Sequence, residues 1–507
     1  MDAVVGFGFT RVTYSVPASR AILERANIAE LLAQDEETKD ADVYGWVRSL
    51  RKQKKIAFAA IGDGSTLDPL QAVLKPGDAA QLSTGVAVKL SGTWQASLGG
   101  KQSHELQVET IKLLGENDAE HNPLQPKYQT PEYLRTIPHL RPRIPANALL
   151  LRLRSQVIAV LTQFFFSEGF VQTHTPILTS SDCEGAGEVF TVSSNATKDS
   201  VQTAKPEKDA QVEHFFRTPK YLTVSAQLHL EALAQSVDKV WTLSPTFRAE
   251  KSDTPRHLSE FYMLEAELCF IEGIEDVMSV IEKMLMAVAH TLGTSPLGAE
   301  LLRARETPAK NAEGGEDEVG ASVLMRRWAA MATGGWPRIT YHEAIELLQQ
   351  ATVDGKASFT FAPTFEKGLQ AEHERYIAAT VGEGWRPVFV TDYPSAQKPF
   401  YMSPSLSTTN SSGTEGTVAC FDLLVPDLCE LVGGSMREHR SAELLQAMEA
   451  KGVASGSLDW YQDLRKYGSV SHGGFGLGFD RLLCYLSGVN SVRDVVAFPR
   501  WHGRCDC

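Results

Sequence analysis

Hydrophobic and polar positions alternate along residues 42–113, and this two-residue period predicts a small β domain. Turn-forming residues such as Asp63, Gly64 and Ser65 separate the alternating runs. Five short strands in about 70 residues are typical of a closed barrel of the OB type, so we assign residues 36–115 to such a domain. The predicted strands are Asp42–Leu50, Ile56–Ile61, Leu70–Leu74, Val86–Ala96 and Glu105–Leu113.

The pattern changes after this domain. Residues 116–146 are polar and rich in proline, which predicts a hinge. Residues 147–507 mix helical and strand-like patterns, so we predict that they form an α+β domain, with polar insertions near 192–212 and 303–322. Its first helix, over residues 147–168, has an apolar stripe at helical spacing: Leu149, Leu153, Val157, Leu161 and Phe164.

Composition narrows the class of protein. The net charge of −13 argues against a protein that coats nucleic acid without specificity, although it leaves room for local basic patches. The seven cysteines lack the spacing of a zinc site, which favours reduced, mostly buried thiols in an intracellular protein. We expect no membrane-spanning helix, because no run of about 18 apolar residues occurs.

The N-terminal segment, residues 1–35, has a composition of its own. Its first 23 residues carry Arg11 and Arg20, several serines and threonines, and one acidic residue, Asp2. This composition is typical of a mitochondrial transit peptide, so we expect mitochondrial residence. The alternative is an ordinary frayed terminus on a cytoplasmic protein.

Two arginines and a histidine gather in one predicted hairpin. The strings Phe-Arg-Ala-Glu at 247–250 and Arg-His-Leu-Ser-Glu-Phe at 256–261 flank a short polar loop, with apolar runs on either side that predict two antiparallel strands. Guanidinium groups bind phosphate oxygens in a bidentate manner, so the hairpin could grip a polyphosphate. The alternative is a charged surface hairpin with cross-strand ion pairs.

A glycine-rich string occupies residues 474–482, Gly-Phe-Gly-Leu-Gly-Phe-Asp-Arg-Leu. Glycines let a backbone approach a ligand closely, and a helix start favours anions, so we predict a strand, a turn and a helix with Arg481 near the cleft. Tight packing between strand and helix would give the same string.

These strings resemble a known family when taken together. With Gly-Phe-Val-Gln-Thr-His-Thr-Pro at 169–176, the hairpin and the glycine-rich string resemble motifs 1, 2 and 3 of class II aminoacyl-tRNA synthetases. Gly-Trp-Val-Arg at 45–48 and Ile-Gly-Asp-Gly-Ser at 61–65 resemble the anticodon-binding OB domain of the aspartate/asparagine/lysine subgroup. The resemblance spans about residues 40–500 and implies an antiparallel catalytic sheet flanked by helices, and a homodimer built through motif 1.

Within the subgroup, three further strings resemble asparaginyl-tRNA synthetases: residues 181–188, 433–438 and 460–465. Aspartate enzymes carry a lysine three residues after the glutamine that is Gln227 here, and this chain has Leu230, which could also be a plain helix-core residue. A carboxamide needs one acceptor and one donor, and we predict that Glu231 and Arg437 supply them. The resemblance implies that Glu184 and Gln227 bind the α-ammonium of L-asparagine.

The implied reaction has two steps in one site, formation of asparaginyl-adenylate from ATP and transfer to the ribose of tRNA(Asn). The resemblance implies that Arg248 holds the α-phosphate, and that Glu250 supports the nucleotide or metal. By the same resemblance Asp422 and Glu430 hold Mg²⁺, which favours oxygen ligands. The other implied ATP-binding residues are Arg256 and His257 at the β- and γ-phosphates, Phe261 and Arg481 around adenine, and the neighbouring Leu258 and Gly478.

Two positions depart from the family pattern. Ser403-Pro404-Ser405 stands where relatives usually have an arginine soon after Phe-Tyr-Met, and Ala226 stands where relatives commonly have glycine. The first departure bears on substrate geometry near that loop.

The β domain carries the densest basic run of this acidic chain, residues 48–55, beginning at Arg48. A cation-lined strand face with an aromatic residue is a common platform for unstacked bases. By resemblance Phe58 stacks on an anticodon base and Gln71 reads one. The alternatives are that Phe58 belongs to the barrel core and that the lysines form a solvated hairpin.

Three other functions are compatible with parts of this pattern. A synthetase-like paralogue that makes free asparagine would tend to lack the OB domain, which this chain keeps. A non-catalytic RNA-binding descendant would have lost motif arginines, and Arg248, Arg256 and Arg481 are all present. An aspartyl-tRNA synthetase is the nearest rival within the class.

Overall fold

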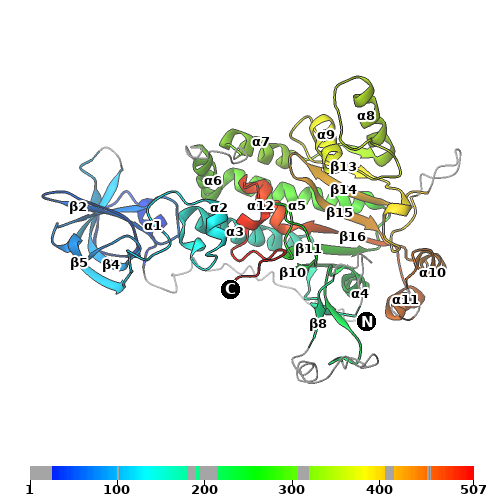
Figure 1. Cartoon of the computed structure of the whole chain (residues 1–507), viewed down its shortest axis with the longest axis horizontal. Coiled ribbons are helices and arrows are strands. Elements are labelled where there is room, and N and C mark those ends of the chain that lie inside the picture. The colour runs from blue at the N-terminus through cyan, green and yellow to red at the C-terminus, as the bar shows by residue number, and fades with distance from the viewer. Residues whose placement is uncertain are drawn as a thin grey trace, which may run out of the picture. The chain divides into compact units, whose positions relative to one another are not determined.

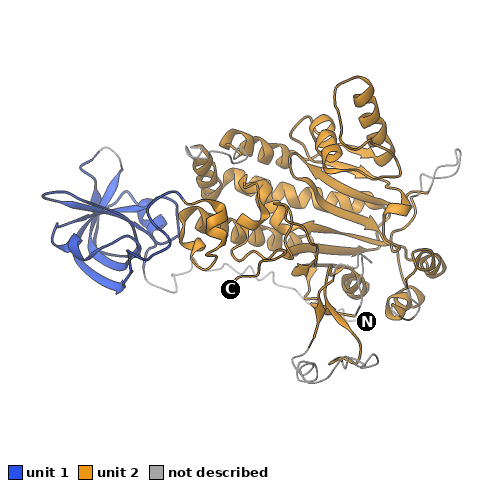
Figure 2. Cartoon of the chain, viewed as in Figure 1, with its two compact units in different colours: residues 1–128 blue, residues 129–507 orange. Residues whose placement is uncertain are grey.

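The computed structural model describes residues 25–99, 102–180, 189–193, 214–306, 319–405, 416–453, 456 and 458–507. The chain divides into two compact units, residues 1–128 and residues 129–507 (Figure 2). The basic start of the predicted transit peptide, the string around Glu184 and most of the two predicted insertions lie outside the described residues.

The first unit is a closed barrel with the strand order β1-β2-β3-β5-β4. Alternate side chains such as Val43, Ile61, Leu90 and Trp94 point into a dry core, which is why the two-residue period was visible in the sequence. The predicted OB-type barrel is confirmed. Its elements are α1 (Ile28–Leu32), β1 (Thr38–Lys52), β2 (Ala57–Gly62), β3 (Leu70–Leu74), β4 (Ala87–Ala96) and β5 (His104–Gly115).

The second unit is built on an eight-stranded sheet with the order β12-β13-β14-β15-β16-β11-β10-β6 (Figure 1). The pairs from β13 to β10 are antiparallel, and helices α5 and α12 pack on its central strands. The predicted α+β catalytic domain is confirmed. The strands are β6 (Val171–Gln172), β7 (Leu178–Thr179), β8 (Thr191–Val192), β9 (Lys220–Leu222), β10 (Lys239–Phe247), β11 (Glu260–Cys269), β12 (Arg338–Thr340), β13 (Val388–Thr391), β14 (Cys420–Val425), β15 (Cys429–Met436) and β16 (His472–Gly478).

Helices surround this sheet and connect its strands (Figure 1). The α-helices are α2 (Pro131–Arg135), α3 (Pro145–Ser167), α4 (Gln227–Val237), α5 (Ile274–Thr294), α6 (Pro296–Glu306), α7 (Ala321–Ala332), α8 (Tyr341–Val353), α9 (Ala371–Val381), α10 (Ser441–Ala450), α11 (Asp459–Lys466), α12 (Phe479–Ser487) and α13 (Val492–Val495).

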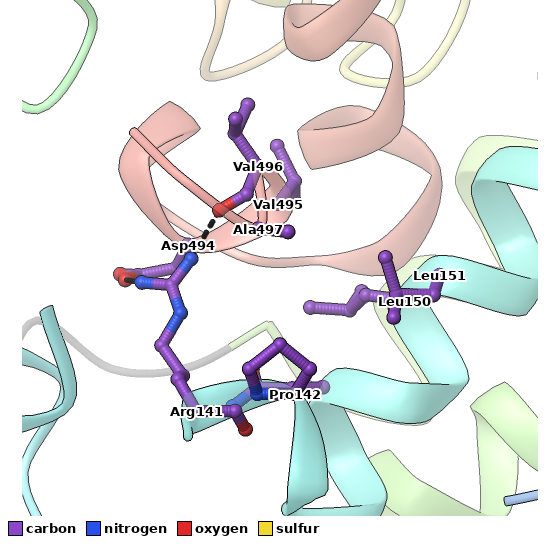
Figure 3. Close-up of a pocket in the computed structure, with 9 residues that line it drawn as sticks. Arg141, Pro142, Leu150, Leu151, Asp494, Val495, Val496 and Ala497 are labelled. Carbon is purple, nitrogen blue, oxygen red and sulfur yellow. Dashed lines mark hydrogen bonds and ion pairs between the residues drawn. The ribbon is translucent and has the colours of Figure 1, made fainter. Parts of the chain in front are cut away.

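The segment predicted as a hinge is only partly a linker. From residue 129 onwards it belongs to the second unit, because its arginines are tied to the chain's C-terminal region. Arg135 donates two hydrogen bonds to Asp494, at 2.9 and 2.5 Å, and the guanidinium of Arg141 reaches Asp494 and the carbonyl oxygen of Val496 (Figure 3). These contacts fix the chain just before α3.

Helix α3 is long and apolar enough to cross a membrane by length and composition alone, contrary to our expectation from the sequence. In the second unit one face of the helix is buried. Its arginines pair within the unit, Arg152 with Glu300 at 2.6 Å and Arg154 with Asp480 at 2.5 Å. The buried stripe is the predicted one except at its end, where Phe165 rather than Phe164 is buried. The difference follows from the 3.6-residue period, since a position four after Leu161 returns to the same face.

Candidate functional site

A cavity of about 210 Å³ opens on the central strands of the eight-stranded sheet. Its wall combines cationic, acidic and small residues from segments far apart in the chain. They are Ser225, Gln227, Leu230, Arg248, Met263, Glu265, Ala266, Glu267, Lys398, Pro399, Tyr401, Met402, Asp422, Glu430, Gly433, Gly434, Arg437, Phe475 and Gly476.

The arginine-bearing hairpin contributes one side of this cavity. Strands β10 and β11 pair antiparallel from Lys239↔Leu268 to Phe247↔Glu260, as predicted. Arg248 follows the end of β10 and lines the cavity, and its guanidinium lies 5.8 Å from the centre of the Phe261 ring. The hairpin therefore directs a cation into the cavity, beside an aromatic ring.

Other charged residues of the hairpin pair with one another. Glu250 lies 3.9 Å from Arg248 and 3.4 Å from the imidazole of His257. Burial lowers the pKa of His257, and Glu250 partly opposes this effect. Leu258 is buried beside them. The loop thus holds a cluster of positively and negatively charged side chains near the cavity. Such a cluster could bind a charged phosphate chain.

The hairpin and the glycine-rich string meet at β15. Arg256 donates to the carbonyl oxygen of Asp427 at 3.2 Å and contacts the thiol of Cys429 at 3.3 Å. Arg481, in the first turn of α12, donates to the carbonyl oxygen of Glu430 at 3.1 Å. Gly478 is the N-cap residue of this helix, and the Arg481 side chain lies close to it. Two distant strings thus present their arginines at the same strand, as expected of a shared nucleotide site.

Two carboxylates converge on one point of the cavity wall. An oxygen of Glu430 and one of Asp422 lie 3.2 and 3.4 Å from where a Cβ on Gly433 would stand, so the glycine leaves a space that both oxygens face. Burial raises the pKa of Glu430, and the charge of Asp422 adds to this effect. Lys398 places its ammonium 3.0 Å from Asp422. Such a pair of oxygen donors suits a hard cation.

A buried ion pair forms the wall on the β11 side. Arg437 donates two parallel hydrogen bonds to Glu267, both at 3.0 Å, and a third to Ser435 at 2.6 Å. Both charged residues line the cavity although they are nearly inaccessible to solvent. Gly474 makes room for this carboxylate, because a Cβ there would lie 2.0 Å from its oxygen. The pair offers a fixed donor and a fixed acceptor side by side.

Glu231 does not line the cavity, contrary to the predicted role in contacting the substrate side chain. Its carboxylate is fully buried and accepts hydrogen bonds from Arg465 (2.6 Å), Tyr461 (2.8 and 2.9 Å), Gln227 (3.0 Å) and His472 (3.1 Å). Its lone pairs are therefore taken up by the protein. The acidic side chain that faces the cavity near Arg437 is Glu267 instead.

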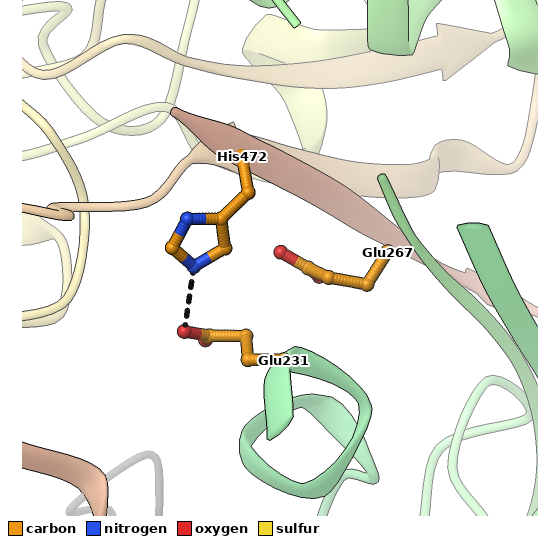
Figure 4. Close-up of side chains that lie close together, drawn as sticks. All are labelled: Glu231, Glu267 and His472. Carbon is orange, nitrogen blue, oxygen red and sulfur yellow. Dashed lines mark hydrogen bonds and ion pairs between the residues drawn. The ribbon is translucent and has the colours of Figure 1, made fainter. Parts of the chain in front are cut away.

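The carboxylates of Glu231 and Glu267 are paired with arginines. Glu231, Glu267 and His472 lie close enough to share an ion, as Figure 4 shows. However, two arginine guanidinium groups already neutralise the two carboxylates. His472 lies between two oxygen atoms, one of Glu231 at 3.1 Å and the carbonyl oxygen of Val470 at 2.7 Å.

Two residues of α4 reach the cavity. Gln227 and Leu230 stand at the start of the helix and line the wall. The amide nitrogen of Gln227 donates to Glu231, which turns its carbonyl oxygen away from that carboxylate. Leu230 is almost completely buried, so it belongs to both the core and the wall of the cavity.

The Ser-Pro-Ser string at 403–405, which departs from the family pattern, is anchored to β15, since the backbone amide of Ser403 donates to the carbonyl oxygen of Met436.

The candidate nucleic-acid surface lies on the barrel. Ala57, Ala59 and Ile61 of β2 point into the core, and Phe58 points outward, which excludes a core role for this aromatic ring. Arg51 pairs with Phe58 across β1 and β2, and its guanidinium lies 5.1 Å from the ring centre.

The same outer face carries two more of the predicted residues. Gln71 pairs with Ala60, two residues from Phe58, and donates to Glu105 at 3.2 Å. The guanidinium of Arg48 lies 5.9 Å from the ring of Trp46, which is 42% exposed. The three predicted anticodon residues therefore sit on neighbouring strands.

Sequence reasoning missed three charged residues of the cavity. Glu265 and Glu267 alternate with apolar residues on β11, and acidic side chains at alternate positions of an otherwise apolar strand were a signal that they share one face. Glu265 accepts a hydrogen bond from Ser225 and two from the amide of Ala226. Lys398 carried no such signal, because its position depends on the loop that brings it to Asp422.

Comparison with known proteins gives matches along both units. The family described as tRNA synthetases class II (D, K and N) matches residues 131–502, and the family of OB-fold nucleic acid binding domains matches residues 41–114. An asparaginyl-tRNA synthetase of Mus musculus is 40% identical over 494 residues, 97% of this chain and 96% of that protein. A mitochondrial asparagine–tRNA ligase of Saccharomyces cerevisiae is 42% identical over 474 residues, 90% of this chain and 91% of that protein.

A solved structure gives a similar match. The asparaginyl-tRNA synthetase from Pyrococcus horikoshii complexed with asparaginyl-adenylate superposes with a TM-score of 0.78 at 27% sequence identity. The alignment covers 95% of this chain and 99% of that one. Sequence and fold therefore agree over nearly the whole chain.

Proposed function

Because the chain belongs to the asparaginyl-tRNA synthetases, a family of class II aminoacyl-tRNA synthetases, we propose that it charges tRNA(Asn) with L-asparagine through an asparaginyl-adenylate made from ATP. The observation that carries the proposal is the cavity wall in which Leu230 stands near the Arg437–Glu267 pair. This wall offers a donor and an acceptor, as a carboxamide requires.

Activation requires the asparagine carboxylate to attack the α-phosphate of ATP, with pyrophosphate leaving. In our proposal Arg248 neutralises the α-phosphate, Arg256 and His257 bind the β- and γ-phosphates, and Glu250 orients this cluster. Adenine lies between Phe261 and Arg481. Such a transfer at phosphorus is accelerated mainly by alignment and charge neutralisation, and cations fixed by strands and helix starts contribute to both.

The amino acid is proposed to bind between α4 and β15. The carbonyl oxygen of Gln227 is free to accept from the α-ammonium because Glu231 holds the amide nitrogen. Arg437 donates to the side-chain oxygen and Glu267 accepts from the side-chain NH₂. Aspartate is disfavoured because its carboxylate would face Glu267 without the lysine that aspartate enzymes provide at the position of Leu230.

We propose that Asp422 and Glu430 hold Mg²⁺. Their oxygens converge over Gly433 and form the hard donor set that this ion prefers. When bound there, the ion would supply charge neutralisation to the phosphate oxygens of ATP.

The acceptor tRNA is proposed to bind the barrel through its anticodon. Phe58 presents a ring for stacking, Gln71 presents an amide for base reading, and Arg48 and Arg51 supply positive charge to the backbone. The match to OB-fold nucleic acid binding domains supports this assignment.

We propose that the enzyme is a homodimer built through the motif 1 region. Apolar side chains remain exposed there, with Leu151 at 41%, Phe166 at 76% and Val171 at 43%. Sedimentation at micromolar concentration should give the mass of two chains. An active monomer would contradict this proposal.

Mitochondrial residence is proposed from the composition of residues 1–23, with Arg11 and Arg20 among serines and threonines. A fusion of residues 1–30 to a reporter should enter mitochondria. A purely cytosolic signal would favour the cytoplasmic alternative.

The function is tested by charging total tRNA with labelled asparagine and aspartate side by side. We expect asparagine-specific charging and asparagine-dependent exchange between ATP and pyrophosphate. Charging with aspartate at equal or greater efficiency would overturn the assignment of substrate.

A further inference from the structure

We propose that Lys398 is a built-in counter-ion of the carboxylate pair Asp422–Glu430, and that its ammonium competes with a divalent cation for Asp422 in the nucleotide-free enzyme. The inference rests on the proposed function, in which these two carboxylates hold Mg²⁺. It adds a residue that regulates when this ion binds.

The ammonium of Lys398 is held at the carboxylate and enclosed around it. Its Nζ lies 3.2 Å from Oδ1 and 3.0 Å from Oδ2 of Asp422, so it contacts both oxygens. It also lies 3.9 Å from the centre of the Tyr393 ring, at a distance that suits a cation–π contact. The Lys398 and Asp422 side chains are 18% and 16% exposed. An ammonium enclosed in this way belongs to the nucleotide-free site and is not a solvated surface charge.

The contact overlaps the place where an ion would bind. Oδ1 of Asp422 and Oε1 of Glu430 face the space above Gly433, and Lys398 contacts the same Oδ1. Two cations on one carboxylate repel each other, and the repulsion is strong in a partly enclosed cavity where water screens poorly. An ion that binds Asp422 must therefore displace the ammonium or bind beside it at reduced affinity.

The cavity gives a reason for such a counter-ion. Two carboxylates that face one enclosed point destabilise the empty site unless a cation is near. Asp422 contacts the ammonium of Lys398 through both carboxylate oxygens, and the Tyr393 ring lies against the same ammonium, so the charge of Lys398 offsets that of the carboxylate. The phosphates of ATP would give the displaced ammonium another anionic partner. The ion is therefore expected to bind tightly only together with the nucleotide.

The test measures binding of Mn²⁺, as a probe for Mg²⁺, to the nucleotide-free full chain by the electron paramagnetic resonance signal of free Mn²⁺. Lys398→Met keeps the length of the side chain and removes its charge, and it should bind Mn²⁺ at least about tenfold more tightly than the wild type. Lys398→Gln is a second variant in case the first does not fold. Lys451→Met is the matched control, since Lys451 is exposed and donates to the carbonyl oxygens of Ser395 and Ala396 beside the same loop.

Two further measurements test whether the gain in Mn²⁺ affinity arises at Asp422. Adding Asp422→Asn to Lys398→Met should abolish the gain in Mn²⁺ affinity. In the presence of ATP, the difference between Lys398→Met and the wild type should shrink. Unchanged or weaker Mn²⁺ binding by a folded Lys398→Met or Lys398→Gln variant would overturn the inference. Failure of the proposed function would appear separately, as a wild-type enzyme without asparagine-dependent ATP–pyrophosphate exchange.

Discussion

At the scale of single residues, the same carboxylate chemistry serves two purposes a few ångströms apart. Glu267 faces the cavity with one guanidinium bound to it, whereas Glu231 is enclosed by donors and supports the wall from behind. We propose that the neighbouring Leu230 favours asparagine, because an apolar side chain gives a substrate carboxylate no counter-charge. The chemical environment of each residue, more than its type, decides its role.

Replacing Glu231 with glutamine should destabilise the fold. Removing one partner of a buried ion pair costs about 3–5 kcal/mol, because Arg465 would be left without its counter-charge. Thermal unfolding at pH 7 measures this loss, with Asp463→Asn, at an exposed pair with Lys466, as the control.

The loss caused by Glu231→Gln should depend on pH. Burial alone would raise the pKa of Glu231, but Arg465, His472 and Arg437 together hold it well below its ordinary value of 4.5. The charged carboxylate therefore contributes its full stability above pH 4.5, and the wild type loses it as the pH falls further. The difference between the two proteins should narrow as the pH falls below 4.5. A difference that grows below pH 4.5 would contradict the assigned direction.

Replacing Leu230 with lysine should let aspartate compete. The new ammonium would enter the cavity wall near Glu267 and give a substrate carboxylate the partner it lacks. We expect the preference for asparagine over aspartate in ATP–pyrophosphate exchange to fall by at least about tenfold, equivalent to about 1.4 kcal/mol. Leu230→Met is the control for shape, and it should leave the ratio unchanged.

At the scale of elements, the site is assembled where strands end and helices begin. The β10–β11 hairpin and the β14–β15 pair contribute charged groups to one cavity. At the junction of β16 with α12, Arg481 donates to the carbonyl oxygen of Glu430, a residue of the cavity wall. Glycines on β15 and β16 allow these strands to pack closely against their neighbours. A Cβ on Gly434, for example, would lie 2.4 Å from the Phe421 ring. The close strand packing and the space for substrate thus arise from the same residues.

Replacing Arg481 with alanine should abolish adenylate formation while the protein remains folded. The residue stands in the first turn of α12 and contacts β15, and we propose that it stacks on adenine. Loss of a desolvated cation–π contact costs roughly 2 kcal/mol, about 30-fold in affinity, and misplacement of ATP adds to this loss. ATP–pyrophosphate exchange and circular dichroism test the expectation. Near-normal exchange in a folded variant would refute the role.

At the scale of the whole molecule, the cavity and the proposed tRNA-binding face belong to different compact units. The cavity lies entirely within residues 129–507, and the basic and aromatic face belongs to residues 1–128. Under the proposed function, we therefore expect mutations to change amino-acid activation and anticodon recognition separately.

Replacing Phe58 with alanine tests this separation. Stacking of a base on an aromatic ring contributes about 1–3 kcal/mol, so the KM for tRNA should rise by roughly 5- to 150-fold. ATP–pyrophosphate exchange, which requires no tRNA, should stay unchanged. Leu98→Ala is the matched control, since Leu98 is an apolar barrel residue that is 97% exposed. Equal losses in charging and exchange would show that Phe58 acts on folding instead.

The sequence by itself determined the barrel, the arginine-bearing hairpin, the glycine-rich junction and the family, because these depend on local periodicity and on short strings. The tertiary structure alone decided which carboxylate lines the cavity. Glu231 is enclosed by Arg465 and His472, more than 200 residues away in the chain, whereas the pleat of β11 turns Glu265 and Glu267 toward the cavity. The position of Lys398 at Asp422 was equally hidden, since contacts between distant segments leave no period in the sequence.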